Sequence, residues 1–110
     1  MVGDNPEVAA ALRFIAEHSH EGIQVADVAK HVSIAVRTLE RHFRAALGRT
    51  MSEEIGRLRL ERAKRLLVES KESIKQVSHH CGFMNVKHFY KIFHAAEGIT
   101  PKAYRNIRVE

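Results

Sequence analysis

The chain has 110 residues, 45% of them hydrophobic and 28% charged, which suits one helical domain or two very small ones and excludes wholesale disorder. Its formal net charge of +5 favours a polyanionic partner, either nucleic acid or an anionic membrane surface. The single cysteine, Cys81, excludes an internal disulfide and suits a reducing compartment, which we expect to be the cytoplasm. Because no apolar stretch reaches about 18 residues, a transmembrane helix is excluded.

Residues 1–5 lack the basic and apolar regions of a secretion signal. They are typical of a linker or a scar left by cloning. We therefore expect the chain to be a fragment of a longer protein whose other part is absent.

Three helices are predicted in the first half of the chain. Asn5, Pro6 and Glu7 form a capped start, and the helix that follows should end near residues 18–20. Apolar spacing predicts a second helix over 25–31 and a third over 36–47. The expected inward residues are Val8, Leu12, Ile15 and Ala16 in the first, Val25, Val28, Ala29 and Val32 in the second, and Leu39, Phe43 and Leu47 in the third.

The second half begins with a capping box, Thr50 with Glu53, that opens the longest predicted helix, over 51–69. A second box, Ser73 with Gln76, starts a short helix. Asn85 can cap the helix that carries Phe89, Phe93 and Ala96, and a last helix runs from Pro101 through Tyr104 and Ile107. Since no useful strand-like alternation is present, we predict an all-α fold of about seven helices.

An internal repeat is the sharpest signal. Residues 25–32 match 74–81 at an offset of 49, whereas Leu39, Phe43, Gly48 and Thr50 match Phe89, Phe93, Gly98 and Thr100 at an offset of 50. The change of offset falls in the turn, where an insertion is best tolerated. Each copy has the order short helix, tight turn, longer helix, which is the helix-turn-helix form whose second helix can enter a major groove.

The repeat predicts a first helix-turn-helix subdomain at 6–50, a linker helix at 51–69 and a second subdomain at 70–110. A joining helix of about 18 residues is roughly 27 Å long at ~1.5 Å per residue. We expect it to hold two recognition helices, over about 36–47 and 86–96, near the ~34 Å between successive major grooves on one face of DNA.

These residues resemble the DNA-binding domain of the AraC/XylS family of bacterial transcription regulators over about 8–108. The likeness is carried by Leu39 to Phe43, Arg59, Ala63, Leu66, Leu67, Ile74 to Phe83, Phe89 to Phe93, Gly98 to Pro101, Tyr104 and Arg105. The sequence at 37–41 and 53–64 is similar to that of the xylose-operon-regulator subgroup. The resemblance implies sequence-specific binding of double-stranded DNA, a missing effector domain that responds to a ligand such as a sugar, and contact with RNA polymerase if the protein is an activator.

One departure from the family pattern concerns the cap of the first recognition helix. The resemblance places a serine four residues before Leu39, where this chain has Ala35. Either Ser33 caps the helix with shifted geometry, or the helix starts less firmly, at a cost of about 1 kcal/mol.

The candidate DNA contacts lie on the two recognition helices and at helix starts. Arginine reads guanine with two hydrogen bonds and glutamate can accept from cytosine, and the resemblance favours Arg37 and Arg41 as base readers; alternatively, this face is merely solvated, with Glu40 paired to Arg44. Phosphate contacts are expected near helix N-termini. The full set is Val36, Arg37, Thr38, Glu40, Arg41, Arg44, Arg49, Thr50, Ser73, Lys75, Asn85, Val86, Lys87, His88, Tyr90 and Lys91.

No cofactor, metal or membrane partner is expected, and no enzyme. His79, His80 and Cys81 are sequence neighbours that point about 100° apart on a helix, so they cannot close around one ion. No glycine-rich phosphate loop, nucleophile elbow or paired acid motif is present. The alternative to a sequence-specific regulator is a non-specific DNA-binding or helical protein-interaction domain.

Overall fold

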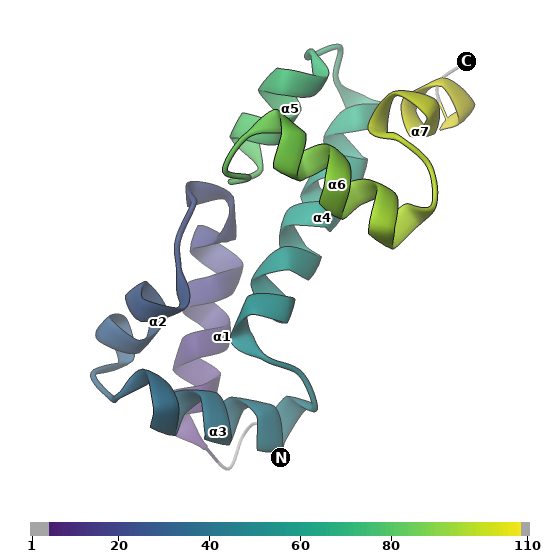
Figure 1. Ribbon diagram of the computed structural model, residues 1–110. Helices are drawn as coiled ribbons and strands as arrows, with labels where there is room; N and C mark the ends of the chain where they lie inside the picture. The colour runs from purple at the N-terminus through teal and green to yellow at the C-terminus, as the bar shows by residue number, and fades with distance from the viewer. Residues whose placement is uncertain (1–4, 109–110) are drawn as a thin grey trace. The chain divides into compact units, whose positions relative to one another are not determined.

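The computed structural model describes residues 5–108, so most of the expected linker lies outside the described part. These residues form seven α-helices and no strand, which confirms the all-α prediction (Figure 1). The helices are α1 (Pro6–His18), α2 (Val25–Val32), α3 (Val36–Leu47), α4 (Met51–Glu69), α5 (Ile74–His80), α6 (Val86–Glu97) and α7 (Pro101–Arg108), with a short 3-10 helix η2 (Ser19–Glu21) after α1. Within this range every helix is too short or too polar to cross a bilayer.

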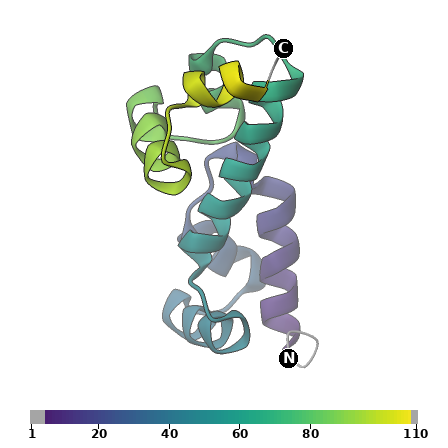
Figure 2. The same ribbon diagram turned by 90° about the vertical axis from the view of Figure 1, so that its right-hand side faces the viewer.

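The chain divides into two units. Of the described residues, unit 1 comprises 5–19 and 23–58, and unit 2 comprises 20–22 and 59–108. Helix α4 contributes residues to both units and is drawn as one unbroken helix in both views (Figures 1 and 2).

Unit 1 is built around α1, which contacts both α2 and α3. Its core draws apolar side chains from four helices: Val8, Ala11, Ile15, Val28, Ala29, Leu39, Phe43, Met51 and Ile55. Because α2 and α3 also contact each other, the core fixes the short helix and the longer helix of the first repeat as a single packed motif.

Unit 2 repeats this plan with α5 and α6, and α6 also contacts α7. Aromatic rings fill its core: Phe89 lies 4.7 Å from Phe83 and 5.6 Å from Phe93 between ring centroids, and Phe93 lies 5.5 Å from Tyr104. Cys81 is fully buried, as expected of a small apolar residue, and burial raises the pKa of its thiol to about 11.

One expected core position, Ala16, is wrong. Ala16 is exposed and Ala11 is buried in its place, because the stripe through Val8 and Ile15 turns by about 100° per residue and leaves Ala16 at its edge.

Both predicted capping boxes are confirmed. The Thr50 hydroxyl accepts from the Glu53 N–H at 3.1 Å while the Glu53 carboxylate accepts from the Thr50 N–H at 2.8 Å. Ser73 and Gln76 make the same reciprocal pair at 3.1 and 2.9 Å. These bonds satisfy backbone donors that a helix start leaves open, so they fix where α4 and α5 begin.

Arg105, on α7, holds the end of α4 within unit 2. Its guanidinium donates to three backbone carbonyls, those of Leu67 at 2.8 Å, Glu72 at 2.6 Å and Ser70 at 3.3 Å. A helix C-terminus carries open carbonyls and partial negative charge, so an arginine there satisfies both.

Candidate nucleic-acid interface

The two helix-turn-helix turns share the same backbone design. The Ile34 N–H donates to Ala29 O, and the Phe83 N–H donates to Ser78 O, each at 3.2 Å. The residue before each donor has a left-handed backbone, with φ of 66° at Ser33 and 89° at Gly82. The internal repeat therefore extends from the apolar residues to the hydrogen bonds of the turn.

The one-residue insertion in the second repeat lies in the turn between α5 and α6. Up to Ile34 and Phe83 the offset is 49, and from the N-cap residues Ala35 and Asn85 onward it is 50. The extra residue in the second turn is therefore Met84, between Phe83 and Asn85, which is 84% exposed.

Helix α3 buries Leu39 and Phe43 and turns its cationic side chains outward. Arg37, Arg41 and Arg44 are exposed, as is Val36, while Thr38 is half-buried. Three guanidinium groups on the open face of the second helix of the motif are suited to base edges and phosphates in a groove.

Glu40 has a contact that the sequence did not reveal. Its carboxylate accepts from the Met51 N–H at 3.0 Å, across the loop between α3 and α4. This places a negative charge at the N-terminus of α4, where the helix dipole favours it. Sequence spacing pointed to Arg44 or to a base as the partner, because Met51 is 11 residues away and only the tertiary fold brings it close.

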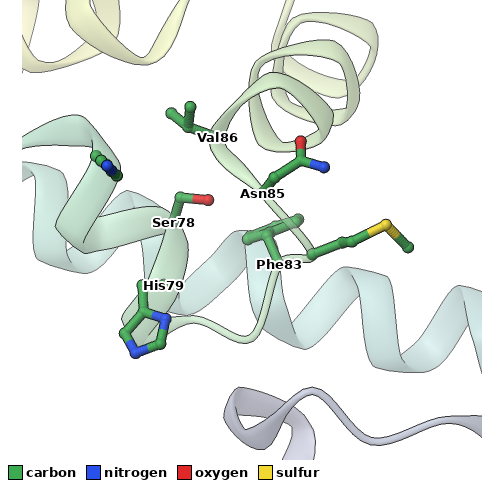
Figure 3. Close-up of a pocket in the computed structure, with 7 residues that line it drawn as sticks. Ser78, His79, Phe83, Asn85 and Val86 are labelled. Atoms are coloured by element: carbon green, nitrogen blue, oxygen red, sulfur yellow. The ribbon is translucent and has the colours of Figure 1, made fainter.

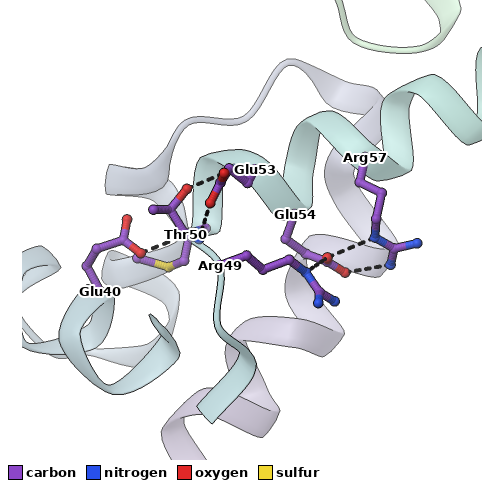
Figure 4. A network of polar contacts seen from close by, with 7 residues as sticks. Glu40, Arg49, Thr50, Glu53, Glu54 and Arg57 are labelled. Atoms are coloured by element: carbon purple, nitrogen blue, oxygen red, sulfur yellow. Dashed lines mark hydrogen bonds and ion pairs between the residues drawn. The ribbon is translucent and has the colours of Figure 1, made fainter. Parts of the chain in front are cut away.

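Arg49 belongs to a network that the sequence also did not reveal (Figure 4). Glu54, whose side chain is 5% exposed, accepts from Arg49 Nε at 2.6 Å and from Arg57 Nε and Nη2 at 3.0 and 2.9 Å. Burial alone raises the pKa of Glu54, but the hydrogen bonds from Arg57 and Arg49 outweigh it and the net pKa falls below its ordinary value. Glu54 thus orients the Arg49 side chain by its Nε atom.

Helix α6 buries Phe89 and Phe93 and exposes Lys87, His88 and Lys91. Tyr90 is 37% exposed and Val86 is half-buried. The Asn85 side chain accepts from the His88 N–H at 2.8 Å, which confirms the predicted cap. This second face has lysine, histidine and tyrosine where α3 has arginine.

The remaining predicted contacts lie at helix starts. Thr50 is half-buried and Ser73 is exposed, and each engages its helix through a capping box. Lys75 is exposed one residue inside α5.

The uncertainty over the cap of α3 is resolved. The N-cap residue is Ala35, with an extended backbone, and its methyl group cannot accept a hydrogen bond. Ser33 is the left-handed residue that ends α2, so it does not cap α3. The first recognition helix therefore starts without a side-chain cap, unlike the second.

The two histidines next to Cys81 make contacts other than a shared metal site. His80 Nδ1 pairs with the Glu72 carboxylate, whereas the His79 ring lies 5.7 Å from that of His80. Within residues 5–108 no three His, Cys, Asp or Glu side chains are grouped so that they can hold a metal ion.

Two helix-turn-helix motifs, each presenting cationic side chains on its second helix, define a helix-turn-helix DNA-binding protein. A family model described as a helix-turn-helix domain matches residues 28–107. The xylose operon regulatory protein of Escherichia coli K12 is 35% identical over 106 residues, which cover 96% of this chain and 27% of that protein. The transcriptional regulator ArgR of Pseudomonas aeruginosa is 33% identical over 104 residues, which cover 94% of this chain and 32% of that protein.

Solved structures agree with these relatives. An AraC-type transcriptional regulator from Chromobacterium violaceum is 32% identical with a TM-score of 0.86, covering 100% of this chain and 98% of that one. The DNA-binding domain of AdpA, solved with a target DNA, is 29% identical with a TM-score of 0.87, covering 94% and 93%. The chain belongs to the AraC/XylS family and is a DNA-binding domain of its transcription regulators. It spans about a quarter to a third of the length of the curated relatives.

Proposed function

We propose that this domain reads double-stranded DNA with α3 and α6 in successive major grooves, as the DNA-binding part of a longer regulator. The observation that carries the proposal is the exposed cationic face on the second helix of each motif. The likeness to the AdpA domain, solved with a target DNA, supports it.

The proposed contacts differ between the two helices. Arg37 and Arg41 read bases from α3, beside Thr38 and Val36, because guanidinium groups make two directional bonds to guanine. Helix α6 relies on Lys87, His88, Tyr90 and Lys91, whose hydrogen bonds to bases are less directional than those of arginine. It therefore contributes more to DNA affinity than to sequence specificity. Phosphates are contacted by Arg44, Arg49, Thr50, Ser73 and Lys75, and Glu40 either accepts from a cytosine or serves α4 alone.

The test is Arg41→Ala, measured by binding to a site selected from a random duplex library. We expect a loss of about 1–3 kcal/mol on that site and relaxed choice at one base pair. Arg13→Ala, which removes the same charge from an exposed position on α1, is the matched control and should leave base choice unchanged.

The alternatives are distinguished by competition. If random duplex competes with the wild-type protein as well as the selected site does, the domain binds DNA without reading it. If neither duplex binds, the domain serves protein interaction and the proposal is wrong. An equal loss for Arg41→Ala on selected and random DNA contradicts the base-reading role of Arg41.

The rest of the regulator is inferred from the relatives. The xylose operon regulatory proteins and the activator RhaS are longer than this chain. We infer that the full protein carries an effector domain, responds to a small molecule such as a sugar, contacts RNA polymerase if it is an activator, and works in the cytoplasm. It acts as a regulator, not as an enzyme. Binding of sugars to the full-length protein, followed by calorimetry, tests the effector assignment.

A further inference from the structure

A hollow of about 270 Å³ lies in unit 2, in the notch between α5 and the start of α6 (Figure 3). It combines polar and apolar walls. The polar side chains come from α5 and from the α6 cap, and the apolar ones come from the turn and the first residue of α6. The lining residues are Lys75, Ser78, His79, Phe83, Met84, Asn85 and Val86.

Ser78 is the unexplained residue of this hollow. It is 2% exposed, and among residues 5–108 its Oγ atom has no hydrogen-bond partner. The hydroxyl points toward the space bordered by Phe83, Asn85 and Val86 (Figure 3). A buried hydroxyl without a partner destabilises a fold, so a ligand that completes its bonding offers an explanation for it.

The polar groups around the hollow are mainly hydrogen-bond donors. Lys75 carries an ammonium group, and Asn85 commits its Oδ1 to the His88 N–H and so keeps its amide N–H groups for another partner. The 12-residue helix α6 begins here and adds the positive end of its dipole. This donor set recognises an anion, and the Phe83, Met84 and Val86 side chains offer a surface for an attached apolar group.

The first motif lacks this chemistry at the matching positions. Lys75, Ser78 and Asn85 correspond to Ala26, Ala29 and Ala35, and Met84 has no counterpart. Ala29 is buried like Ser78, so the packing of the fold does not require a hydroxyl there. The donors and the inserted methionine therefore distinguish the second motif alone.

We propose that this hollow seats one phosphodiester of the DNA backbone, with the phosphate on Lys75, Ser78 and Asn85 and the deoxyribose against Met84 and Val86. The proposal rests on the proposed function, since that function brings DNA to the start of α6. Ser78 Oγ is buried at the wall of the hollow and has no hydrogen-bond partner within residues 5–108, so a turn about χ1 that brings it to a phosphate breaks no bond within this part of the protein. The second motif then binds mainly the DNA backbone, whereas the first motif reads bases with its arginines.

The experiment compares Ser78→Ala and Lys75→Gln with wild type, using the selected duplex at several salt concentrations. Ser78→Ala should weaken binding about tenfold, as expected for one hydrogen bond to a charged group, with an unchanged salt slope and no fall in melting temperature. Lys75→Gln should weaken binding and reduce the salt slope by about 0.9, which corresponds to one phosphate. Lys71→Gln, an exposed lysine outside the hollow, is the matched control and should retain a larger slope.

A second experiment modifies the DNA instead of the protein. Replacing single phosphates by neutral methylphosphonates should identify one position at which neither Ser78→Ala nor Lys75→Gln has a further effect. If both variants bind the selected site with wild-type affinity, the proposed phosphate site is wrong but the proposed function stands. If the wild-type protein does not prefer that site over random duplex, the proposed function itself is wrong. If inorganic phosphate shifts the amide resonances of the hollow while both variants bind DNA normally, the anion is a free phosphate and the DNA seat is wrong.

Discussion

At the scale of single residues, Glu54 shows how a buried carboxylate prepares a surface charge. It lies between Arg49 and Arg57, and its hydrogen bonds to both hold its pKa below the ordinary value of 4.5 despite burial. The exposed parts of these arginines are thereby held in a fixed geometry. A guanidinium that is already oriented loses less conformational freedom when it meets a phosphate.

Glu54→Gln should lower the free energy of unfolding by about 2 kcal/mol at neutral pH, because charge-assisted bonds are replaced by neutral ones. A depressed pKa stabilises the folded state above the unfolded pKa, and the contribution is lost as pH falls through the folded pKa. The wild-type advantage should therefore shrink as pH falls below 4.5. Urea unfolding between pH 7 and pH 3 measures this, with the exposed Glu69→Gln as control.

At the scale of the helix, the two recognition helices differ in how they start. Asn85 caps α6 through the His88 N–H, whereas α3 begins at Ala35, which has no side-chain acceptor. Both N-cap residues have an extended backbone, so the same cap is geometrically possible at both sites. The first recognition helix therefore lacks a side-chain cap that its backbone geometry would allow.

Ala35→Ser should restore the cap and raise the free energy of unfolding by about 1 kcal/mol. Its reciprocal, Asn85→Ala, should lower it by about the same amount. Thermal and urea unfolding of both variants provide the comparison. If Ala35→Ser leaves stability unchanged while Asn85→Ala reduces it, then α3 does not leave a donor open at its start and the interpretation of Ala35 is incorrect.

At the scale of the whole molecule, local sequence signals predicted what is local in the structure. Helix bounds, both capping boxes and the repeat follow from spacing, caps and glycines close together in the chain. The bonds of Glu40 to Met51, of Arg49 to Glu54 and of Arg105 to three carbonyls connect different elements or cross a loop, as far as 38 residues apart. Such contacts depend on packing, so helical periodicity does not reveal them, and the hollow at Ser78 needed the fold as well.

The two motifs in one chain predict a dependence on the spacing of the DNA half-sites. The joining helix α4 has 19 residues, about 28 Å at ~1.5 Å per residue. Successive major grooves on one face of DNA are about 34 Å apart, and about 5 inserted base pairs turn the second half-site to the opposite face.

Such an insertion should lower the affinity about tenfold or more and reduce the salt slope, since one motif loses its phosphate contacts. About 10 inserted base pairs restore the face but add roughly 34 Å that a helical joint cannot span, so they should be no better. Binding to a series of duplexes with different spacers measures this, and equal affinity across the series would show that one motif binds alone.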